Sequence, residues 1–199
     1  MLVRERPADG LLAEEGTSEP GESGRRWVFD PLDGTVSFLY GYPHWCVSVA
    51  LEDAEGTAVG VVYDPNRDEL FAAERGAGAT LAGRAISVGE APPLAQALVA
   101  TGFGYDPAWR AQQAEVVRGL LPAVRDIRRA GSAALDLAWL AAGRLDAYYE
   151  RGLNAWDWAA GSLLVSEAGG TVEELRGEPF GLIAGPQAVV TALRPLVDA

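Results

Sequence analysis

The sequence places four carboxylates beside apolar segments, at points where a chain turns or begins a helix: Glu14, Asp30, Asp33 and Asp157. Oxygen ligands of this kind bind hard divalent cations such as Mg²⁺, Mn²⁺ and Ca²⁺. The chain has one cysteine and one histidine, which excludes a metal site built from cysteines or from two histidines. Four carboxylates and one backbone carbonyl fit two Mg²⁺ ions that share an aspartate, the arrangement of two-metal hydrolysis.

Asp30 and Asp33 lie in the segment Asp30-Pro-Leu-Asp-Gly-Thr35, directly after a short strand that we expect at 27–29. Pro31 fixes φ and removes a ladder hydrogen bond, so we expect the strand to end there. Both aspartates can then face one point across a turn. The Leu32 carbonyl lies between them and offers a third oxygen.

The next residues of this segment predict an anion site. Gly34 lets the backbone approach a ligand closely. Thr35 opens a short apolar stretch, 36–40, in which we expect one or two helical turns whose first N–H groups can bind a phosphate. On these residues alone, the alternative is that Asp-Pro-x-Asp-Gly is only a favourable turn.

A helix is expected at 156–168, with Asp157 in its first turn and small residues at 159–161. An aspartate at this point also stabilises a helix by about 1 kcal/mol, so capping is the alternative to metal binding. The small residues would let the helix lie close against a sheet or a ligand. Glu14 has the weaker case, because charged side chains at strand ends are usually only solvated.

Composition narrows the class of protein. The 199 residues are 49% hydrophobic and 22% charged, as in ordinary globular proteins of one or two domains. All 16 cations are arginine and the net charge is −12, which argues against nucleic acid or an anionic membrane as partner. No apolar run reaches the roughly 18 to 20 residues of a membrane span, and no signal peptide is visible. We therefore expect a cytoplasmic protein.

The elements change in character near Pro92-Pro93. Residues 1–91 form a sheet-rich half, with a flexible loop at 16–25 and strands expected at 11–13, 27–29, 45–51, 58–63, 70–73 and 80–81. Residues 92–199 form a half in which strands and helices alternate, with strands expected at 97–101, 124–127, 145–149 and 182–184 and helices at 107–121, 132–142, 156–168 and 186–196. We expect a single α+β unit over 1–199 with stacked layers.

Two segments carry a family resemblance, which covers the chain from Leu12 onward: Asp30-Pro-Leu-Asp-Gly-Thr35, and Trp156-Asp-Trp-Ala-Ala-Gly161 with Glu167-Ala-Gly-Gly170. They resemble the two signature motifs of the inositol monophosphatase family, the first shared with the wider lithium-sensitive, Mg²⁺-dependent phosphatases. The resemblance implies a layered α/β sandwich similar to the sugar-phosphatase (inositol monophosphatase and fructose-1,6-bisphosphatase) fold. Family members usually begin well upstream of this match, so we expect the two usual N-terminal helices, with their Asp and Lys, to be lacking.

The resemblance also implies the site. Its metal ligands map onto Glu14, Asp30, the Leu32 carbonyl, Asp33 and Asp157, and Asp33 also contacts substrate. Its phosphate cradle maps onto Gly34 and Thr35, and its contacts to substrate hydroxyls onto Gly131, Ser132, Ala133, Glu150 and Asp157. Glu14 and Thr35 assist the water that attacks phosphorus. Without the resemblance, Glu150 can be a surface residue paired with Arg151, and Ser132 a helix N-cap.

The resemblance implies a Mg²⁺-dependent phosphomonoesterase that hydrolyses inositol monophosphate, uses two or more Mg²⁺ ions, is lithium-sensitive and forms a homodimer. One alternative is the same chemistry on histidinol phosphate or fructose 1,6-bisphosphate, because the motifs bind phosphate and metals and not the rest of the substrate. An alternative of another class is a catalytically impaired remnant that binds phosphate esters or a protein partner.

Overall fold

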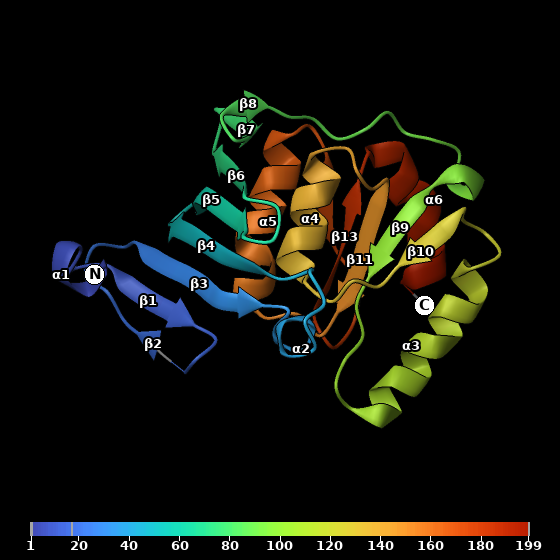
Figure 1. Cartoon of the computed structure of the whole chain (residues 1–199), viewed down its shortest axis with the longest axis horizontal. Coiled ribbons are helices and arrows are strands. Elements are labelled where there is room, and N and C mark those ends of the chain that lie inside the picture. The colour runs from blue at the N-terminus through green and yellow to red at the C-terminus, as the bar shows by residue number, and fades with distance from the viewer. Residues whose placement is uncertain (1, 17, 199) are drawn as a thin grey trace.

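The computed structural model describes residues 2–16 and 18–198 and contains two sheets (Figure 1). The first has eight strands in the order β2-β1-β3-β4-β5-β6-β7-β8. Its strands are β1 (Gly10–Ala13), β2 (Ser18–Glu19), β3 (Arg26–Asp33), β4 (Cys46–Asp53), β5 (Gly56–Asp64), β6 (Glu69–Glu74), β7 (Gly78–Leu81) and β8 (Arg84–Ala85). All neighbours pair antiparallel except β1 and β3, which are parallel.

The second sheet has five strands in the order β10-β9-β11-β13-β12. They are β9 (Leu98–Thr101), β10 (Asp126–Arg128), β11 (Ala147–Arg151), β12 (Thr171–Glu174) and β13 (Gly181–Gly185). β9 pairs parallel with both β10 and β11, and β13 pairs antiparallel with β11 and β12. The helices are α1 (Leu2–Glu5), α2 (Thr35–Leu39), α3 (Pro107–Leu120), α4 (Ala133–Ala141), α5 (Ala155–Glu167) and α6 (Gln187–Val197), with one 3₁₀ turn at Leu94–Gln96.

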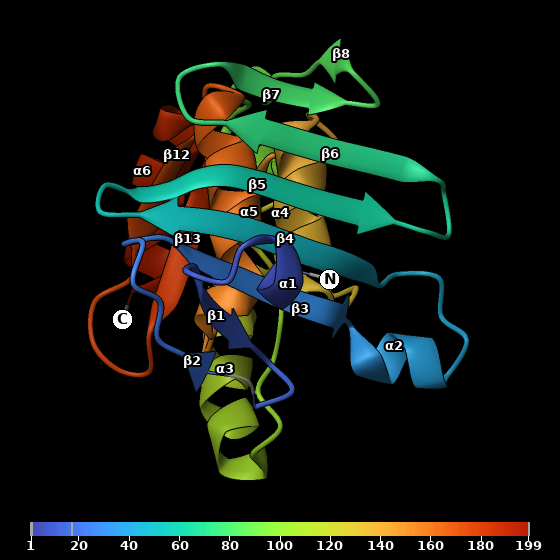
Figure 2. The same cartoon turned by 90° about the vertical axis from the view of Figure 1, so that its left-hand side faces the viewer.

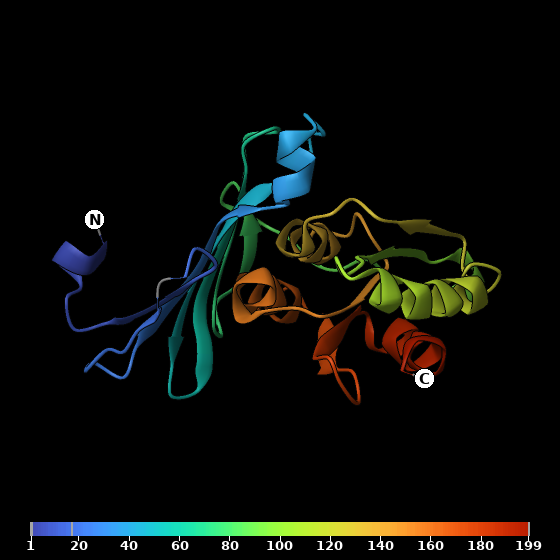
Figure 3. The same cartoon turned by 90° about the horizontal axis from the view of Figure 1, so that it is seen from below.

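The elements stack as sheet, helices, sheet, helices (Figure 3). Helices α4 and α5 lie between the two sheets, and α3 and α6 cover the far side of the five-stranded sheet (Figure 3). Figure 2 looks onto the other side of the eight-stranded sheet, where α1 is the one helix of the described chain. None of the helices in the described ranges combines the length and the apolar composition that crossing a bilayer requires.

Helix α4 is buried along its whole length, as its apolar composition predicts: each of its residues except Trp139 is buried. Helix α5 packs tightly on both sides because glycines replace larger side chains. A Cβ on Gly60 of β5 would lie 2.8 Å from the carbonyl oxygen of Ala160, and a Cβ on Gly161 would lie 2.6 Å from the Cβ of Leu137 on α4. The small residues at 159–161 therefore allow the close packing that the sequence suggested.

The layered α+β fold expected from the sequence is confirmed, and most predicted elements are found with ends shifted by one or two residues. The sequence did not predict the edge strands β8 and β12, and three further details differ. Strand β3 continues through Pro31 to Asp33, the loop expected at 16–25 contains the short edge strand β2, and the strand expected at 124–127 is Asp126–Arg128. In the last case Val124 is buried in the core formed with α6 and does not join the sheet.

Candidate active site

A β-bulge in β3 brings Asp30 and Asp33 to the same side of the strand. Asp30 pairs with Ser48 and Asp33 with Cys46, so three steps along β3 match two along β4. In a regular strand, residues three apart point to opposite faces, and the extra residue of the bulge cancels this. Pro31 is compatible with the strand because a bulge needs no ladder N–H at that point.

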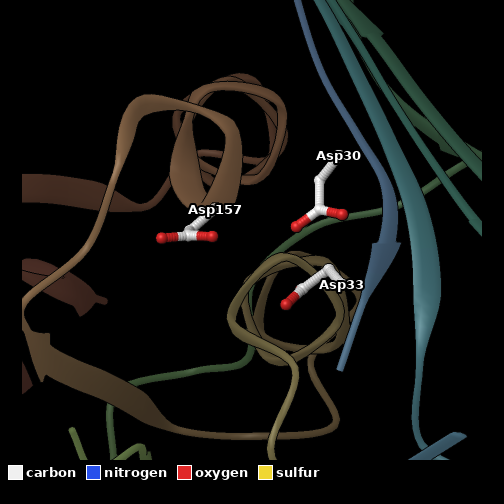
Figure 4. A group of neighbouring side chains, drawn as sticks. All are labelled: Asp30, Asp33 and Asp157. Atoms are coloured by element: carbon white, nitrogen blue, oxygen red, sulfur yellow. The ribbon is translucent and has the colours of Figure 1, made fainter. Parts of the chain in front are cut away.

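Asp157, in the first turn of α5, faces the two aspartates of β3 (Figure 4). One carboxylate oxygen of each of the three residues lies within 4.8 Å of the others. Asp30 is 2% and Asp33 8% exposed. Three mostly buried carboxylates that share a small space are a donor set for a hard divalent cation.

Hydrogen bonds hold the Asp33 carboxylate at the start of α4. Its Oδ2 accepts from the Ser132 hydroxyl at 2.7 Å and from the Ala134 N–H at 2.8 Å. Ser132 also caps α4, because its Oγ accepts from the Leu135 N–H at 3.3 Å. The other oxygen of Asp33 remains available to a ligand.

The other two aspartates are held in the same way, each by one oxygen. The Leu32 N–H donates to Oδ1 of Asp30 at 2.8 Å, and the Asn154 N–H donates to Oδ2 of Asp157 at 2.6 Å. The Leu32 carbonyl accepts from the Thr35 hydroxyl at 3.0 Å. Backbone donors thus fix the carboxylates while leaving oxygens that can bind a cation.

The carboxylates of the site repel one another and lie away from water. Burial, with the neighbouring charge of Asp33, raises the pKa of Asp30 well above its usual range. Burial also raises the pKa of Asp33 to about 7 and that of Asp157 to about 6, in each case with the charge of another carboxylate adding to it. Because desolvated like charges are unfavourable, a bound cation would stabilise the ionised forms. The residues present therefore fit a divalent metal.

The three aspartates open into a cavity of about 340 Å³. Ten residues that the sequence nominated line it: Glu14, Asp30, Leu32, Asp33, Gly34, Thr35, Gly131, Ala133, Glu150 and Asp157. Glu14 is exposed and outside the tight trio, but its charge raises the pKa of Asp157 and of Asp30. Ser132 does not line the cavity: it is 1% exposed and its hydroxyl points to Asp33.

Glu150 stands at the end of β11, in the wall of the same cavity. The Tyr148 hydroxyl donates to its Oε2 at 3.0 Å, and burial raises the pKa of Glu150 to about 8. A Cβ on Gly102 would lie 2.0 Å from Oε1 of Glu150, so the loop after β9 packs directly on this carboxylate. Arg151 is not its partner, since the guanidinium of Arg151 pairs with Asp198 at 3.2 Å.

Gly34 occupies a position that other residues do not fit. Its φ of 93° is left-handed, and a Cβ there would lie 3.0 Å from the His44 carbonyl and 3.2 Å from the Gly131 carbonyl. The loop before α2 and the loop before α4 therefore meet at this point. Thr35 follows at the start of α2 and lines the cavity.

Two further polar side chains, Glu167 of the second motif and His44 outside both motifs, make structural contacts. Glu167 accepts from the N–H groups of Gly76 and Gly78, both at 2.8 Å, and so holds the turn between β6 and β7. His44 is 3% exposed, and its Nε2 lies 3.1 Å from Oδ1 of Asp136.

Sequence reasoning missed a second wall of the cavity, formed mainly by the loop after β9 and the start of α3: Phe103, Tyr105, Asp106, Trp109 and Arg129. The available signal was the pair Gly102 and Gly104 directly after a predicted strand, because ligands bind at the carboxyl ends of strands in such sheets. Arg129 also lies two residues before Gly131, for which the family resemblance implies a contact to substrate hydroxyls.

Comparison with known proteins identifies relatives that match nearly the whole chain. A sequence model of the inositol monophosphatase family matches residues 2–197. The chain is 45% identical over 205 residues to the inositol-1-monophosphatase of Rhizobium meliloti, covering 99% of this chain and 77% of that protein. It is 46% identical over 208 residues to the Nus factor SuhB of Xylella fastidiosa, covering 98% of this chain and 75% of that protein.

Solved structures give the same result. The extragenic suppressor protein suhB of Bartonella henselae superposes with a TM-score of 0.92 and 41% identity, covering 98% of this chain and 78% of that one. The inositol monophosphatase of Anabaena superposes with a TM-score of 0.90 and 37% identity, covering 98% and 80%. This chain thus spans roughly three quarters of the length of each relative.

Proposed function

Because the chain belongs to the inositol monophosphatase family, we propose that it hydrolyses inositol monophosphate to inositol and inorganic phosphate with Mg²⁺. The observation that carries this proposal is the trio Asp30, Asp33 and Asp157, whose oxygens lie within 4.8 Å of one another. A cavity of about 340 Å³ beside the trio leaves room for a small phosphomonoester.

In this proposal the three aspartates would hold Mg²⁺, with Glu14 and the Leu32 carbonyl as further oxygen ligands. Bound Mg²⁺ supplies the positive charge that attracts the phosphate and makes phosphorus easier to attack. The chain itself fixes the carboxylates through the N–H groups and the hydroxyl described above. Preorganised ligands of this kind avoid reorganisation during the reaction.

The remaining nominated residues act on water and substrate. The exposed Glu14 carboxylate accepts a proton from the attacking water, which the Thr35 hydroxyl helps to orient. The N–H groups of Gly34 and Thr35 donate to phosphate oxygens. Glu150 and Asp157 accept hydrogen bonds from hydroxyls of the inositol ring, next to the backbone of Gly131 and Ala133. Ser132 acts through Asp33, because its hydroxyl is committed to that carboxylate.

A phosphate-release assay tests the proposal and its alternatives. Inositol 1-phosphate, histidinol phosphate and fructose 1,6-bisphosphate are each incubated with the enzyme in Mg²⁺ and in EDTA. We expect Mg²⁺-dependent release that is fastest with inositol 1-phosphate, lost in Asp157→Asn and retained in Glu90→Gln, a change at an exposed acidic residue. Release from none of the three esters would favour the impaired phosphate-binding remnant and overturn the proposal.

We further propose a cytoplasmic homodimer that is inhibited by lithium. Support for self-association comes from apolar side chains left exposed on α2 and just after it, where Leu39 is 72%, Tyr40 86% and Tyr42 53% exposed. Patches of this kind mark contact surfaces. Sedimentation velocity on the protein and on Leu39→Asp tests the dimer, and LiCl against NaCl at equal concentration in the phosphate assay tests the lithium effect.

A further inference from the structure

Among the described residues, Arg129 is the cation of the cavity wall that has no carboxylate within ion-pair distance. The other arginine in the wall, Arg151, forms an ion pair with Asp198 at 3.2 Å and donates to the Pro179 carbonyl. Within residues 2–16 and 18–198, no carboxylate lies within 4 Å of the Arg129 guanidinium. All other charged residues of the wall are acidic: Glu14, Asp30, Asp33, Asp106, Glu150 and Asp157.

The guanidinium of Arg129 lies between two loops of the cavity wall. Its centre is 5.7 Å from the ring centroid of Phe103, and Nη2 is 3.5 Å from the Phe103 carbonyl oxygen. Its Nη1 would lie 2.7 Å from a Cβ on Gly131. The planar group thus lies beside an aromatic ring and a glycine backbone, and its side chain is exposed.

Arg129 lies beside Gly131 and its charge reaches Glu150, the two residues proposed to contact the alcohol part of a substrate. The scissile phosphate belongs at the three aspartates, because that is where a cation can bind it. The charge of Arg129 acts on Glu150, whose pKa it lowers against the larger effect of burial. Asp136, on α4, is exposed to the same charge but is paired with His44.

We propose that Arg129 binds a second anionic group, a carboxylate or a phosphate, on the alcohol part of the phosphomonoester. The inference rests on the proposed function and extends its substrate class, because inositol monophosphate offers only hydroxyls at this end. A guanidinium matches carboxylate and phosphate oxygens with two parallel hydrogen bonds. Without such a cation, the acidic wall would repel a substrate that carries a second negative charge.

The test compares two esters with the same skeleton. 3-Phosphoglycerate carries a carboxylate where glycerol 3-phosphate carries a hydroxymethyl group. A second pair tests a phosphate in the same way, because fructose 1,6-bisphosphate carries a phosphate where fructose 1-phosphate carries a hydroxyl group. For each ester kcat/KM is measured where it is hydrolysed, and Kd by calorimetry where it is not. The proteins are wild type, Arg129→Gln, Arg129→Lys and the control Arg128→Gln.

Arg128 is a matched control because it is the neighbouring exposed arginine, pairs with Asp126 at 2.6 Å and does not line this cavity. We expect Arg129→Gln to lower the preference for the doubly anionic ester of at least one pair by about tenfold or more, the cost of a hydrogen bond to a charged group. Arg129→Lys should lower this preference less than Arg129→Gln does, and Arg128→Gln should leave it unchanged.

Equal losses on both members of each pair, or the same preference in Arg129→Gln and Arg128→Gln, would overturn the inference. Failure of the proposed function looks different. In that case the wild type releases no phosphate from inositol 1-phosphate in Mg²⁺, while the calorimetric comparison of the two esters still shows whether Arg129 discriminates between them.

Discussion

At the scale of single residues, each aspartate of the site serves the fold with one oxygen and is free to bind with the other. Asp33 shows this most clearly, because its Oδ2 joins β3 to the start of α4 through Ser132 and Ala134. The three aspartates of the trio could be nominated from the sequence because each of them stands in one of two short contiguous motifs. The role of Ser132 could not, because it depends on a contact between residues 99 positions apart.

Asp33→Asn should separate these two roles. The amide oxygen of asparagine can still accept from Ser132 and Ala134, while the negative charge that a shared metal ligand needs is gone. We expect turnover to fall by about a hundredfold or more, as for the loss of one strong preorganised contact. The metal-free protein should melt at the same temperature or higher, because a buried, repelled charge has been removed.

Kinetics in Mg²⁺ and thermal melts in EDTA measure the two effects of Asp33→Asn. A large drop in the melting temperature of the metal-free variant would mean that Asp33 is above all a structural residue. Asp106→Asn is the control for charge, because Asp106 lines the cavity but belongs to the start of α3 and not to the trio.

At the scale of elements, the site depends on how closely α5 approaches the sheet. Most helices and strands were predictable, because apolar spacing and glycines mark them, as for α4 and α5. The bulge of β3 was not, because proline normally ends a strand and nothing in Asp30-Pro-Leu-Asp33 reveals that β4 continues to pair with it. Strand β12 was also not predicted, because Glu173 and Glu174 interrupt the apolar pattern of this edge strand, which forms by pairing with β13.

Gly60→Ala should weaken both the fold and the metal site. Its Cβ would lie 2.8 Å from the Ala160 carbonyl oxygen and 3.0 Å from the Ala160 Cα, so α5 must move away from β5. Overpacking of this kind costs about 1 to 3 kcal/mol. Because Asp157 is in the first turn of α5, we expect weaker Mg²⁺ binding as well, measured by calorimetry beside denaturant unfolding.

Gly89→Ala is the matched control for Gly60→Ala, because a Cβ at Gly89 meets no atom within 4 Å. We expect its stability to stay within about 0.5 kcal/mol of the wild type. If Gly60→Ala lost stability but bound Mg²⁺ as tightly as Gly89→Ala, the position of Asp157 would not depend on the contact between β5 and α5.

At the scale of the whole molecule, the site concentrates negative charge in a chain whose net charge is already −12. The carboxylates elsewhere whose pKa is lowered, such as Asp53 and Asp198, gain stability from arginine partners. Three buried carboxylates of the cavity, Asp33, Glu150 and Asp157, have the opposite shift, because burial and nearby negative charge raise their pKa and favour the protonated form. The folded protein therefore contains a cluster of negative charges that lowers its stability and that a bound cation can neutralise.

Without metal, stability should fall as the pH rises from about 5 to 8. The pKa is about 6 for Asp157, 7 for Asp33 and 8 for Glu150 in the folded protein, against about 4 in an unfolded chain. The folded state therefore holds more protons in this range, so the contribution of these groups is complete below about pH 4 and is lost as the pH passes each folded pKa. Melts in EDTA across this range measure it. Glu150→Gln should show a shallower decline, and a melting temperature that rose steadily to pH 8 would contradict the assignment.

Mg²⁺ should reverse this loss at neutral pH, because it binds the ionised carboxylates of the folded state. At a hundredfold excess over Kd, a ligand of the native state stabilises by about 2.7 kcal/mol, which for a chain of this length raises the melting temperature by about 5 to 10 °C. Salt alone also screens a negative protein, so NaCl at matched ionic strength is the reference. Inorganic phosphate added to Mg²⁺ should stabilise further, through the N–H groups of Gly34 and Thr35.

We expect Asp30→Ala and Asp157→Ala to reduce the increase in melting temperature that Mg²⁺ causes, and Glu90→Ala, at an exposed position outside the cavity, to keep it. If all three variants kept the same increment, Mg²⁺ would act only by screening, and the trio would not be its site.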